Sequence, residues 1–138
     1  MRIKFHLLTQ KVSQLAIQPS SNSKTKLVTT ADIAKPQLWQ VDFSKDDPEI
    51  NHIVELSGHN YNVKVLSWSP KGTYLITACD YPILWRDHGH TVTNAGKLPQ
   101  EESEIHSVKW SPDEKRVIIG TQANYLFFHN IEQRQQIK

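Results

Sequence analysis

The sequence between residues 58 and 85 reads GHNYNVKVLSWSPKGTYLITACDYPILW. Two runs rich in β-branched and aromatic residues, VKVLSW (63–68) and TYLITAC (73–79), flank the tetrapeptide Ser-Pro-Lys-Gly at 69–72. Proline presets φ at the second position of a type I turn, and glycine is favoured at the fourth. The stretch therefore predicts two antiparallel strands joined by a tight turn, with a third strand starting at ILW (83–85).

The same pattern occurs elsewhere in the chain. A shift of 42 residues superposes LSWSPKGTYLITACDYPILW (66–85) on VKWSPDEKRVIIGTQANYLF (108–127), so that the Trp-Ser-Pro turns coincide and Trp85 meets Phe127. Nearer the N-terminus, the same landmarks are matched by LAIQP (15–19), KLVTTAD (26–32) and LW (38–39). We therefore predict three copies of one supersecondary unit.

The copies favour one architecture. YLIT and RVIIG carry apolar residues without clean alternation, which indicates strands covered on both faces. A period of about 40–45 residues with three or four short strands per unit is typical of a β-propeller. Helical repeats of similar length are excluded because the apolar residues do not follow a 3.6-residue period. The sequence predicts an all-β fold, a partial β-propeller with about three blades of an expected seven.

The second copy resembles the WD-repeat family through its Gly58-His59 pair and the tryptophan that follows it. In that family a histidine, a serine or threonine, an aspartate and a tryptophan bridge the strands of one blade by hydrogen bonds. The resemblance implies such a network, structural and not catalytic, at His59, Thr77, Asp80 and Trp85. Arg86 stands where the family has the aspartate of its Trp-Asp dipeptide, and we expect the network in the second copy and not in the first or third.

Residues 1–138 are expected to form the N-terminal part of such a propeller. The predicted blades cover residues 10–45, 53–90 and 101–134, and residues 2–8 (RIKFHLL) resemble the strand that completes the last blade of a WD propeller. Three blades cannot close a ring, so both end faces would remain as apolar patches that stable monomers avoid. We therefore expect the sequence to be a piece of a longer protein, or to close with partners.

The sequence gives little support for a catalytic or metal-binding site. The chain lacks the motifs of nucleotide-binding, serine-hydrolase and zinc-protease sites. Asp87-His88-Gly89-His90 offers two imidazoles without further ligands nearby in sequence, so we expect a solvated loop between copies. Cys79 is expected to be a small core residue. The acidic residues Glu101, Glu102 and Glu104 are expected in a solvated loop. We predict no catalytic residues, no metal site, no cofactor and no enzyme activity.

The composition and charge of the chain limit the classes of partner and the compartment that we expect. Hydrophobic residues make up 38% of the 138 residues, charged residues 22%, and the formal net charge is +2. The basic pairs Lys24/Lys26 and Lys115/Arg116 are expected to decorate turns, so direct nucleic-acid binding is not predicted. One cysteine permits no internal disulfide and suits a reducing compartment. No apolar stretch approaches the ~20 residues of a membrane span.

The order of the copies is similar to the start of the middle-sized, WD-repeat subunits of the chromatin assembly factor 1 complex. The matching runs extend from Val63 to Arg86 and from Glu104 to Asp113, after a divergent first blade with KLVTTAD. The resemblance implies a nuclear, non-catalytic scaffold in a histone chaperone that deposits core histones into nucleosomes during DNA replication and repair. Its implied partners are the large subunit of that complex and core histones.

Two alternatives remain open. WD-repeat scaffold subunits of intraflagellar transport particles also begin Met-Arg-x-Lys-x-x-Leu-Leu, as this chain does, and their third blade resembles IHSVKWSPDEKRV (105–117). That resemblance implies a location in the cytoplasm or cilium. Some propellers are metal-dependent hydrolases or lactonases, but the strands expected nearest the channel, 63–68 and 105–110, lack the necessary set of ligands.

Overall fold

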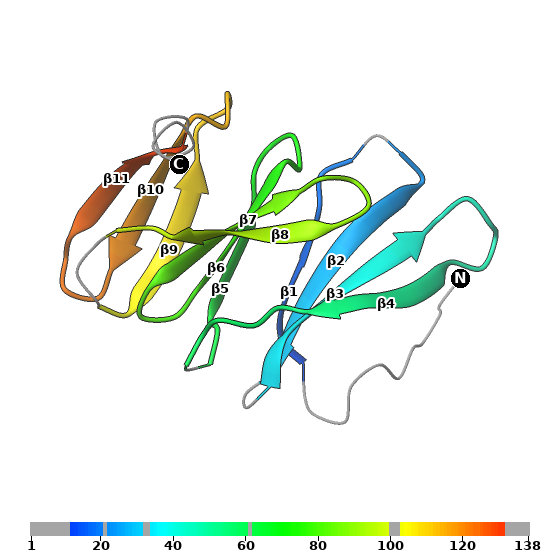
Figure 1. The fold of residues 1–138 in the computed structure, drawn as a ribbon, viewed down its shortest axis with the longest axis horizontal. Coiled ribbons are helices and arrows are strands. Elements are labelled where there is room, and N and C mark those ends of the chain that lie inside the picture. The colour runs from blue at the N-terminus through cyan, green and yellow to red at the C-terminus, as the bar shows by residue number, and fades with distance from the viewer. Residues whose placement is uncertain (1–11, 21, 32–33, 61, 100–102, 132–138) are drawn as a thin grey trace.

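The computed structural model describes residues 12–20, 22–31, 34–60, 62–99 and 103–131. In this part of the chain, strands account for nearly all regular structure, and they form three antiparallel sheets placed side by side (Figure 1). The all-β prediction with three propeller-like blades is confirmed. The predicted ring-closing strand at 2–8 lies outside the described residues.

Each sheet is a meander of strands that are consecutive in sequence. The first sheet contains β1 (Val12–Ile17), β2 (Lys24–Ala31), β3 (Ala34–Asp42) and β4 (Glu49–Glu55) in that order. The second contains β5 (Val65–Trp68), β6 (Tyr74–Ala78), β7 (Pro82–Asp87) and β8 (Val92–Lys97). The third contains β9 (Ile105–Trp110), β10 (Arg116–Thr121) and β11 (Leu126–Asn130).

The first strand of each sheet lies along one inner edge. β5 contacts both β1 and β9, so the three sheets fan out from a common line as propeller blades do. Trp68 donates its indole N–H to Ala16 O of the first sheet at 3.1 Å, and Trp110 repeats this contact to Ser67 O at 3.4 Å. The predicted Trp-Ser-Pro repeat therefore places one tryptophan at each junction between sheets.

Two apolar cores lie between the sheets. The core between the first and second sheets includes Val28 and Leu38 against Leu75 and Trp85. The core between the second and third sheets is formed by the other face of the second sheet. Every residue of β6 is buried because β6 has a sheet on each side. This double cover explains why YLIT does not alternate in polarity.

The fourth strands lie where the sequence carried little signal. β4 and β8 occupy segments largely between the predicted blades, and both are mostly exposed. Each is the outermost strand of its sheet, so it has little apolar surface to bury and little hydrophobic pattern to detect.

The third sheet has a different register from the one that the sequence superposition predicted. Val117 pairs with His129, whereas its counterpart Leu75 pairs with Trp85. His129 and not Phe127 therefore occupies the tryptophan position, and the superposition of Trp85 on Phe127 is wrong at this point. The cause is the longer turn between β10 and β11, where Asn124 adopts φ 66°.

Candidate functional site

The turns of the three sheets gather at two opposite ends. The Ser-Pro end contains the turns between the first and second strands, at 18–20, 69–73 and 111–115. The Gly-His end contains residues 58–60, 79–81 and 103–104. Polar side chains cluster at both ends, since the turns there leave them free to meet across neighbouring sheets.

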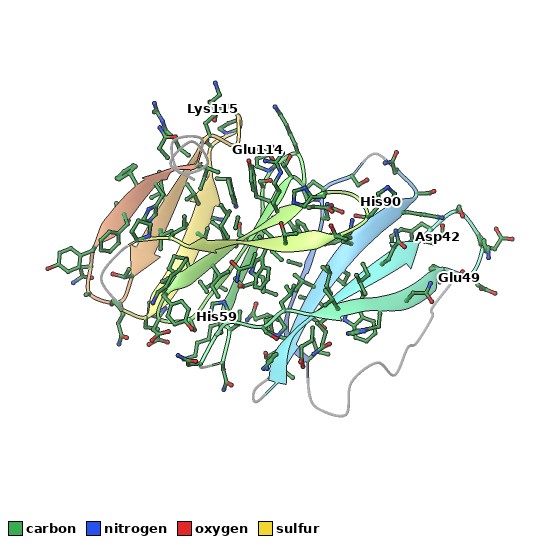
Figure 2. The ribbon with its side chains drawn as sticks, in the orientation of Figure 1. Asp42, Glu49, His59, His90, Glu114 and Lys115 are labelled. Carbon is green, nitrogen blue, oxygen red and sulfur yellow. The ribbon has the colours of Figure 1, made fainter. Side chains whose placement is uncertain are left out.

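The Gly-His end of the second sheet carries a continuous chain of hydrogen bonds. Trp85 Nε1 donates to Thr77 Oγ1 at 2.8 Å, and Thr77 Oγ1 lies 2.7 Å from His59 Nε2. Because the indole N–H can only donate, the threonine hydroxyl is free to donate to His59. The structure thus brings three of the four residues named from the sequence into direct contact, and Figure 2 labels His59 at this end.

Asp80 is connected to this series of hydrogen bonds through Cys79, which the sequence analysis predicted only as a core residue. His59 Nδ1 lies 3.3 Å from Cys79 Sγ, and Cys79 Sγ donates to Asp80 Oδ1 at 2.9 Å. The thiol therefore stands between the imidazole and the carboxylate. The signal that could have found Cys79 is its position next to Asp80 at the end of a buried strand.

Burial sets the protonation of this cluster. Removal from water lowers the pKa of His59 to about 4, although a bond to the Thr77 backbone and the charge of Asp80 oppose the shift. His59 is therefore neutral at pH 7, as an acceptor from Thr77 requires. Burial also raises the pKa of the Cys79 thiol, which keeps it protonated as a donor and makes it a poor nucleophile.

Part of the network recurs in the first sheet, where we had not expected it. Trp39 Nε1 donates to Thr29 Oγ1 at 2.9 Å, in the positions that correspond to Trp85 and Thr77. His52 packs edge-on against the Trp39 ring at 5.0 Å. In the third sheet the threonine position is occupied by Ile119, which cannot accept such a bond.

A hollow of about 550 Å³ lies beside the network at the Gly-His end. Lys64 and Glu104 form an ion pair of 2.8 Å across the junction of the second and third sheets. The hollow is lined by Asn60, Asn62, Lys64, Cys79, Asp80 and Glu104. Its mixture of amide, ammonium and carboxylate groups can bind the backbone and polar side chains of another protein.

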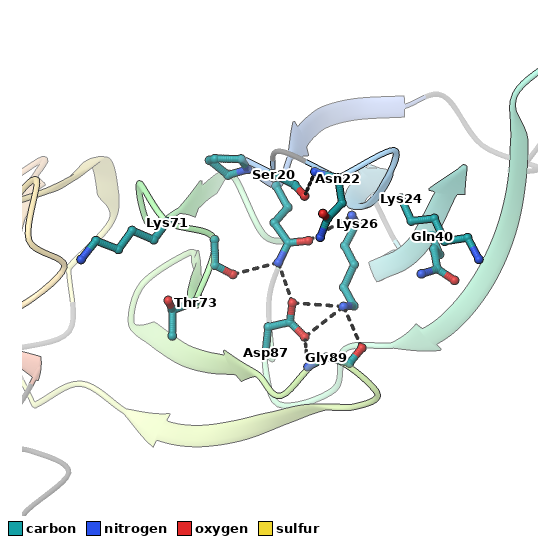
Figure 3. Close-up of a pocket in the computed structure, with 12 residues that line it drawn as sticks. Ser20, Asn22, Lys24, Lys26, Gln40, Lys71, Thr73, Asp87 and Gly89 are labelled. Atoms are coloured by element: carbon teal, nitrogen blue, oxygen red, sulfur yellow. Dashed lines mark hydrogen bonds and ion pairs between the residues drawn. The ribbon is translucent and has the colours of Figure 1, made fainter. Parts of the chain in front are cut away.

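At the Ser-Pro end, Lys26 and Asp87 connect the first and second sheets (Figure 3). Lys26 Nζ lies 3.0 Å from Asp87 Oδ1, and their side chains are 9% and 10% exposed. Gln18 donates to Gly72 O at 2.8 Å and also bonds Asp87. The prediction that Lys26 decorates a turn is therefore wrong: Lys26 lies within β2 and is buried, because a carboxylate from another sheet neutralises it.

The Asp87 carboxylate is held ionised by these neighbours. Burial alone would raise the pKa of Asp87, but the backbone N–H of Gly89 and the side chains of Lys26 and Gln18 together hold that pKa below its ordinary value. The pocket above this cluster has a volume of about 460 Å³. In Figure 3 the Lys71 side chain points away from Asp87, so Lys71 takes no part in the ion pair.

Glu114 connects the second and third sheets by hydrogen bonds, as Lys26 and Asp87 connect the first and second sheets by an ion pair. It adopts φ 63°, and its carboxylate accepts bonds from the Ser69 hydroxyl, from Thr73 Oγ1 at 2.8 Å and from Lys71 N at 2.9 Å. Burial would raise the pKa of Glu114, but the bonds from Ser69, Thr73 and the backbone lower it. Sequence reasoning missed this residue because its partners come from the previous repeat.

The other candidate residues have ordinary roles. His88 bonds Thr93 Oγ1 at 2.9 Å in the exposed turn after β7, and Glu104 pairs with Lys64. Glu101 and Glu102 lie outside the described residues. Within the described ranges, no group of three or more His, Cys, Asp or Glu side chains could hold a metal ion. The same ranges contain no helix that is both long and apolar enough to span a bilayer.

Comparison with known proteins agrees with this geometry. Residues 50–81 match the family model described as "WD domain, G-beta repeat". The match starts in β4 and ends after β6, so the sequence repeat includes the outer strand of one sheet and the first two strands of the next. Residues 50–81 therefore resemble one WD repeat, a unit typical of non-catalytic scaffolds, and the three antiparallel sheets are consistent with blades of a partial WD-repeat propeller.

The chain's particular resemblance is to the B subunit of chromatin assembly factor 1 from Schizosaccharomyces pombe. The two sequences are 27% identical over 124 residues, which covers 76% of this chain and 24% of the relative. This distant similarity extends across most of the chain. The chain spans about a quarter of that relative's length.

Proposed function

We propose that the chain is a non-catalytic docking scaffold of the chromatin-assembly type, acting in the nucleus with a histone chaperone. The observation that carries this proposal is the similarity to the B subunit of chromatin assembly factor 1 across 76% of the chain. The row of three sheets with packed apolar cores between them supports it, since a scaffold needs a preorganised surface that changes little on binding. Its partners are the large subunit of such a complex and core histones.

The hollow at the Gly-His end is the proposed docking surface. Asn60 and Asn62 carry exposed amide groups at its rim, and the Lys64–Glu104 pair provides a cation and an anion. The hydrogen-bonded chain from Trp85 to Asp80 fixes the floor. An extended segment of a partner can satisfy its backbone groups against these side chains without covering a large area.

The test is to tag the endogenous protein, measure its native mass and identify the proteins that co-purify by mass spectrometry. We expect core histones and a large chaperone subunit. Asn62→Arg, which fills the hollow, should reduce their recovery at least several-fold. Thr91→Arg, an exposed substitution at the opposite end, should not.

Recovery of ciliary transport subunits in place of histones would transfer the scaffold function to an intraflagellar transport particle. A product that purifies without any partner would contradict the scaffold proposal itself.

A further inference from the structure

The junction between the second and third sheets contains an arginine that is held by aromatic packing. Arg86 lies in β7 and pairs in register with Tyr74, and its guanidinium carbon lies 5.7 Å from the centre of the Tyr74 ring. Tyr74 in turn stacks on Trp110 of the third sheet, with 5.7 Å between ring centres and 11° between ring planes. The guanidinium group is therefore positioned over an aromatic ring and is attracted to its π face.

The same guanidinium group lacks hydrogen-bond acceptors. Arg86 Nε is buried, and no other described residue accepts a hydrogen bond from it. Arg86 also takes no part in the ion pairs between described residues, which join Lys26 to Asp87, Lys45 to Glu49 and Lys64 to Glu104. A charged donor removed from water without an acceptor is unfavourable, so Arg86 gains from an anion that reaches it.

The first junction shows which group the second one lacks. There the cation Lys26 meets Asp87 of the next sheet at 3.0 Å. Ile131 holds the position of Asp87 in the third sheet, since each donates its backbone N–H to the carbonyl just before the second strand of its sheet. Ile131 is 1% exposed and belongs to the apolar core. The second junction therefore has a cation, Arg86, and no carboxylate at the position that supplies one in the first.

The carboxylates on the flanking turns have other partners. Dashed lines in Figure 3 join the Asp87 carboxylate to Lys26 and Gln18, on the side of the first junction. Glu114 accepts hydrogen bonds from the 69–73 turn of the second sheet. Both carboxylates hold neighbouring sheets together, and neither pairs with Arg86.

Two further polar side chains lie beside Arg86. Thr93 pairs in register with Arg86 across β7 and β8, which places both side chains on one face of the sheet. His88 Nε2 lies 2.9 Å from Thr93 Oγ1, and both residues are exposed. In the tautomer with a proton on Nε2, the hydroxyl accepts from the imidazole and keeps its own proton to donate. We call Arg86, His88 and Thr93 the Arg86 corner.

We propose that the Arg86 corner binds one carboxylate, the side chain of an aspartate or glutamate in a partner protein. A planar carboxylate matches the guanidinium fork and accepts two hydrogen bonds from it. Its single negative charge balances the positive charge of Arg86, whereas a doubly charged phosphate group would also be repelled by Asp87 and Glu114 on the flanking turns. Packing on Tyr74 fixes the guanidinium group before the ligand arrives, which reduces the entropy lost on binding.

The test is a titration of the 138-residue chain with the peptide acetyl-Gly-Ser-Glu-Ser-Gly-amide, followed by ¹⁵N nuclear magnetic resonance. We expect the Arg86 Nε–H signal and the Thr93 backbone amide signal to shift and to saturate with peptide concentration. The same peptide with Gln in place of Glu should leave both signals unchanged, because a neutral amide cannot pair with the guanidinium charge.

Two variants separate a specific site from general attraction between charges. Arg86→Gln should weaken binding of the Glu peptide about 10-fold, as followed by the Thr93 amide. Arg116→Gln is the matched control, because it removes the same charge from an exposed arginine of the third sheet, and it should leave the affinity unchanged.

Two further variants test the geometry of the Arg86 corner. Arg86→Lys keeps the charge but loses the planar fork, so binding should be about 3-fold weaker than in the parent chain. Thr93→Val removes one donor and should have an effect of similar size. Unfolding midpoints within a few degrees of the parent chain establish that these variants are folded.

An Arg86 signal that does not respond to the Glu peptide would overturn the proposal, and so would an equal response to the Gln peptide. Equal losses in Arg86→Gln and Arg116→Gln would show attraction without a site. Tighter binding of inorganic phosphate than of acetate would contradict the choice of a carboxylate. Asn62→Arg at the Gly-His end should leave peptide binding unchanged, so this proposal and the docking function can fail independently.

Discussion

The junction between the first and second sheets differs in chemistry from the junction between the second and third, although both have the same geometry. Lys26 and Asp87 form a buried ion pair at the first junction. Tyr74 and Ile131 occupy the corresponding positions at the second and belong to its apolar core. The same repeated backbone can therefore be stabilised at a junction by a buried ion pair or by apolar packing, provided that each buried polar group has its partner within the same junction.

The turns at the Ser-Pro end show a second contrast. Gly72 and Glu114 occupy the same turn position, and both have positive φ. A Cβ on Gly72 would lie 2.7 Å from Pro19 O, so at the first junction the turn at Gly72 packs against the backbone of Pro19 and leaves no room for a side chain. At the second junction Glu114 has room for a side chain and uses it to satisfy the preceding turn.

The largest effect should come from breaking the ion pair. Lys26→Met leaves the Asp87 carboxylate buried without its cation, and we expect a loss of about 3 kcal/mol in the free energy of unfolding. Urea denaturation at pH 7 measures it. The double variant Lys26→Met with Asp87→Leu should recover much of the loss, because an apolar pair then resembles the second junction. A single variant as stable as the parent chain would show that the pair contributes nothing.

Gly72→Ala should come next. It forces a Cβ against the backbone of Pro19 and also strains a residue at φ 78°, so we expect a loss of about 2 kcal/mol. Gly89→Ala is the matched control, since Gly89 has φ 90° but no atom within 4 Å of the added Cβ. Its loss should be about 1 kcal/mol, from backbone strain alone. Equal losses would mean that the close approach to Pro19 is unimportant.

Removing the Glu114 carboxylate should cost somewhat less. Glu114→Ala leaves the Ser69 hydroxyl and the Lys71 N–H without their acceptor, and we expect a loss of about 1.5 kcal/mol at pH 7. Because the folded state lowers the pKa of Glu114, this contribution is present above the unfolded value of 4.5 and is lost as the pH falls through the folded value. The exposed Asp113→Ala should change stability by less. A pH-independent difference between Glu114→Ala and the parent would contradict this assignment.

The smallest effect should come from His59. Its folded pKa of about 4 lies below the unfolded value of 6.5, so the unfolded state binds more protons between these values. Stability from this group is complete above pH 6.5 and falls by about 1 kcal/mol towards pH 4, with allowance for its partial exposure. His59→Gln should flatten the stability profile in that window. Thermal unfolding at pH 4.5, 5.5 and 7 provides the comparison, and an unchanged slope would argue against a neutral buried His59.

Much of the fold could be predicted from the sequence because the Trp-Ser-Pro turns mark the inner hairpins of the second and third sheets, and LAIQP (15–19) marks that of the first. β4 and β8 could not be predicted in the same way, since an outer strand exposed to solvent lacks an apolar pattern. The register of β11 depends on the length of its preceding turn, and sequence similarity at Phe127 pointed to the wrong pairing.

The network at the Gly-His end was accessible because family resemblance pointed to His59, Thr77, Asp80 and Trp85. The insertion of Cys79 between His59 and Asp80 was not, since it depends on side-chain distances. Contacts between sheets could not be predicted from the sequence either. Lys26 and Asp87, or Glu114 and Ser69, are more than 40 residues apart, and no local pattern connects them.

Hydrogen–deuterium exchange of the chain in dilute solution tests most directly whether the three sheets form this row. Amides of β6 (Tyr74–Ala78), a fully buried strand with a sheet on each side, should exchange slowest, whereas those of β1 and β11, strands whose residues are mostly exposed, should exchange at least 100-fold faster. Equal protection of β1, β6 and β11 would contradict the arrangement, because it would require every sheet in the dilute chain to be equally covered.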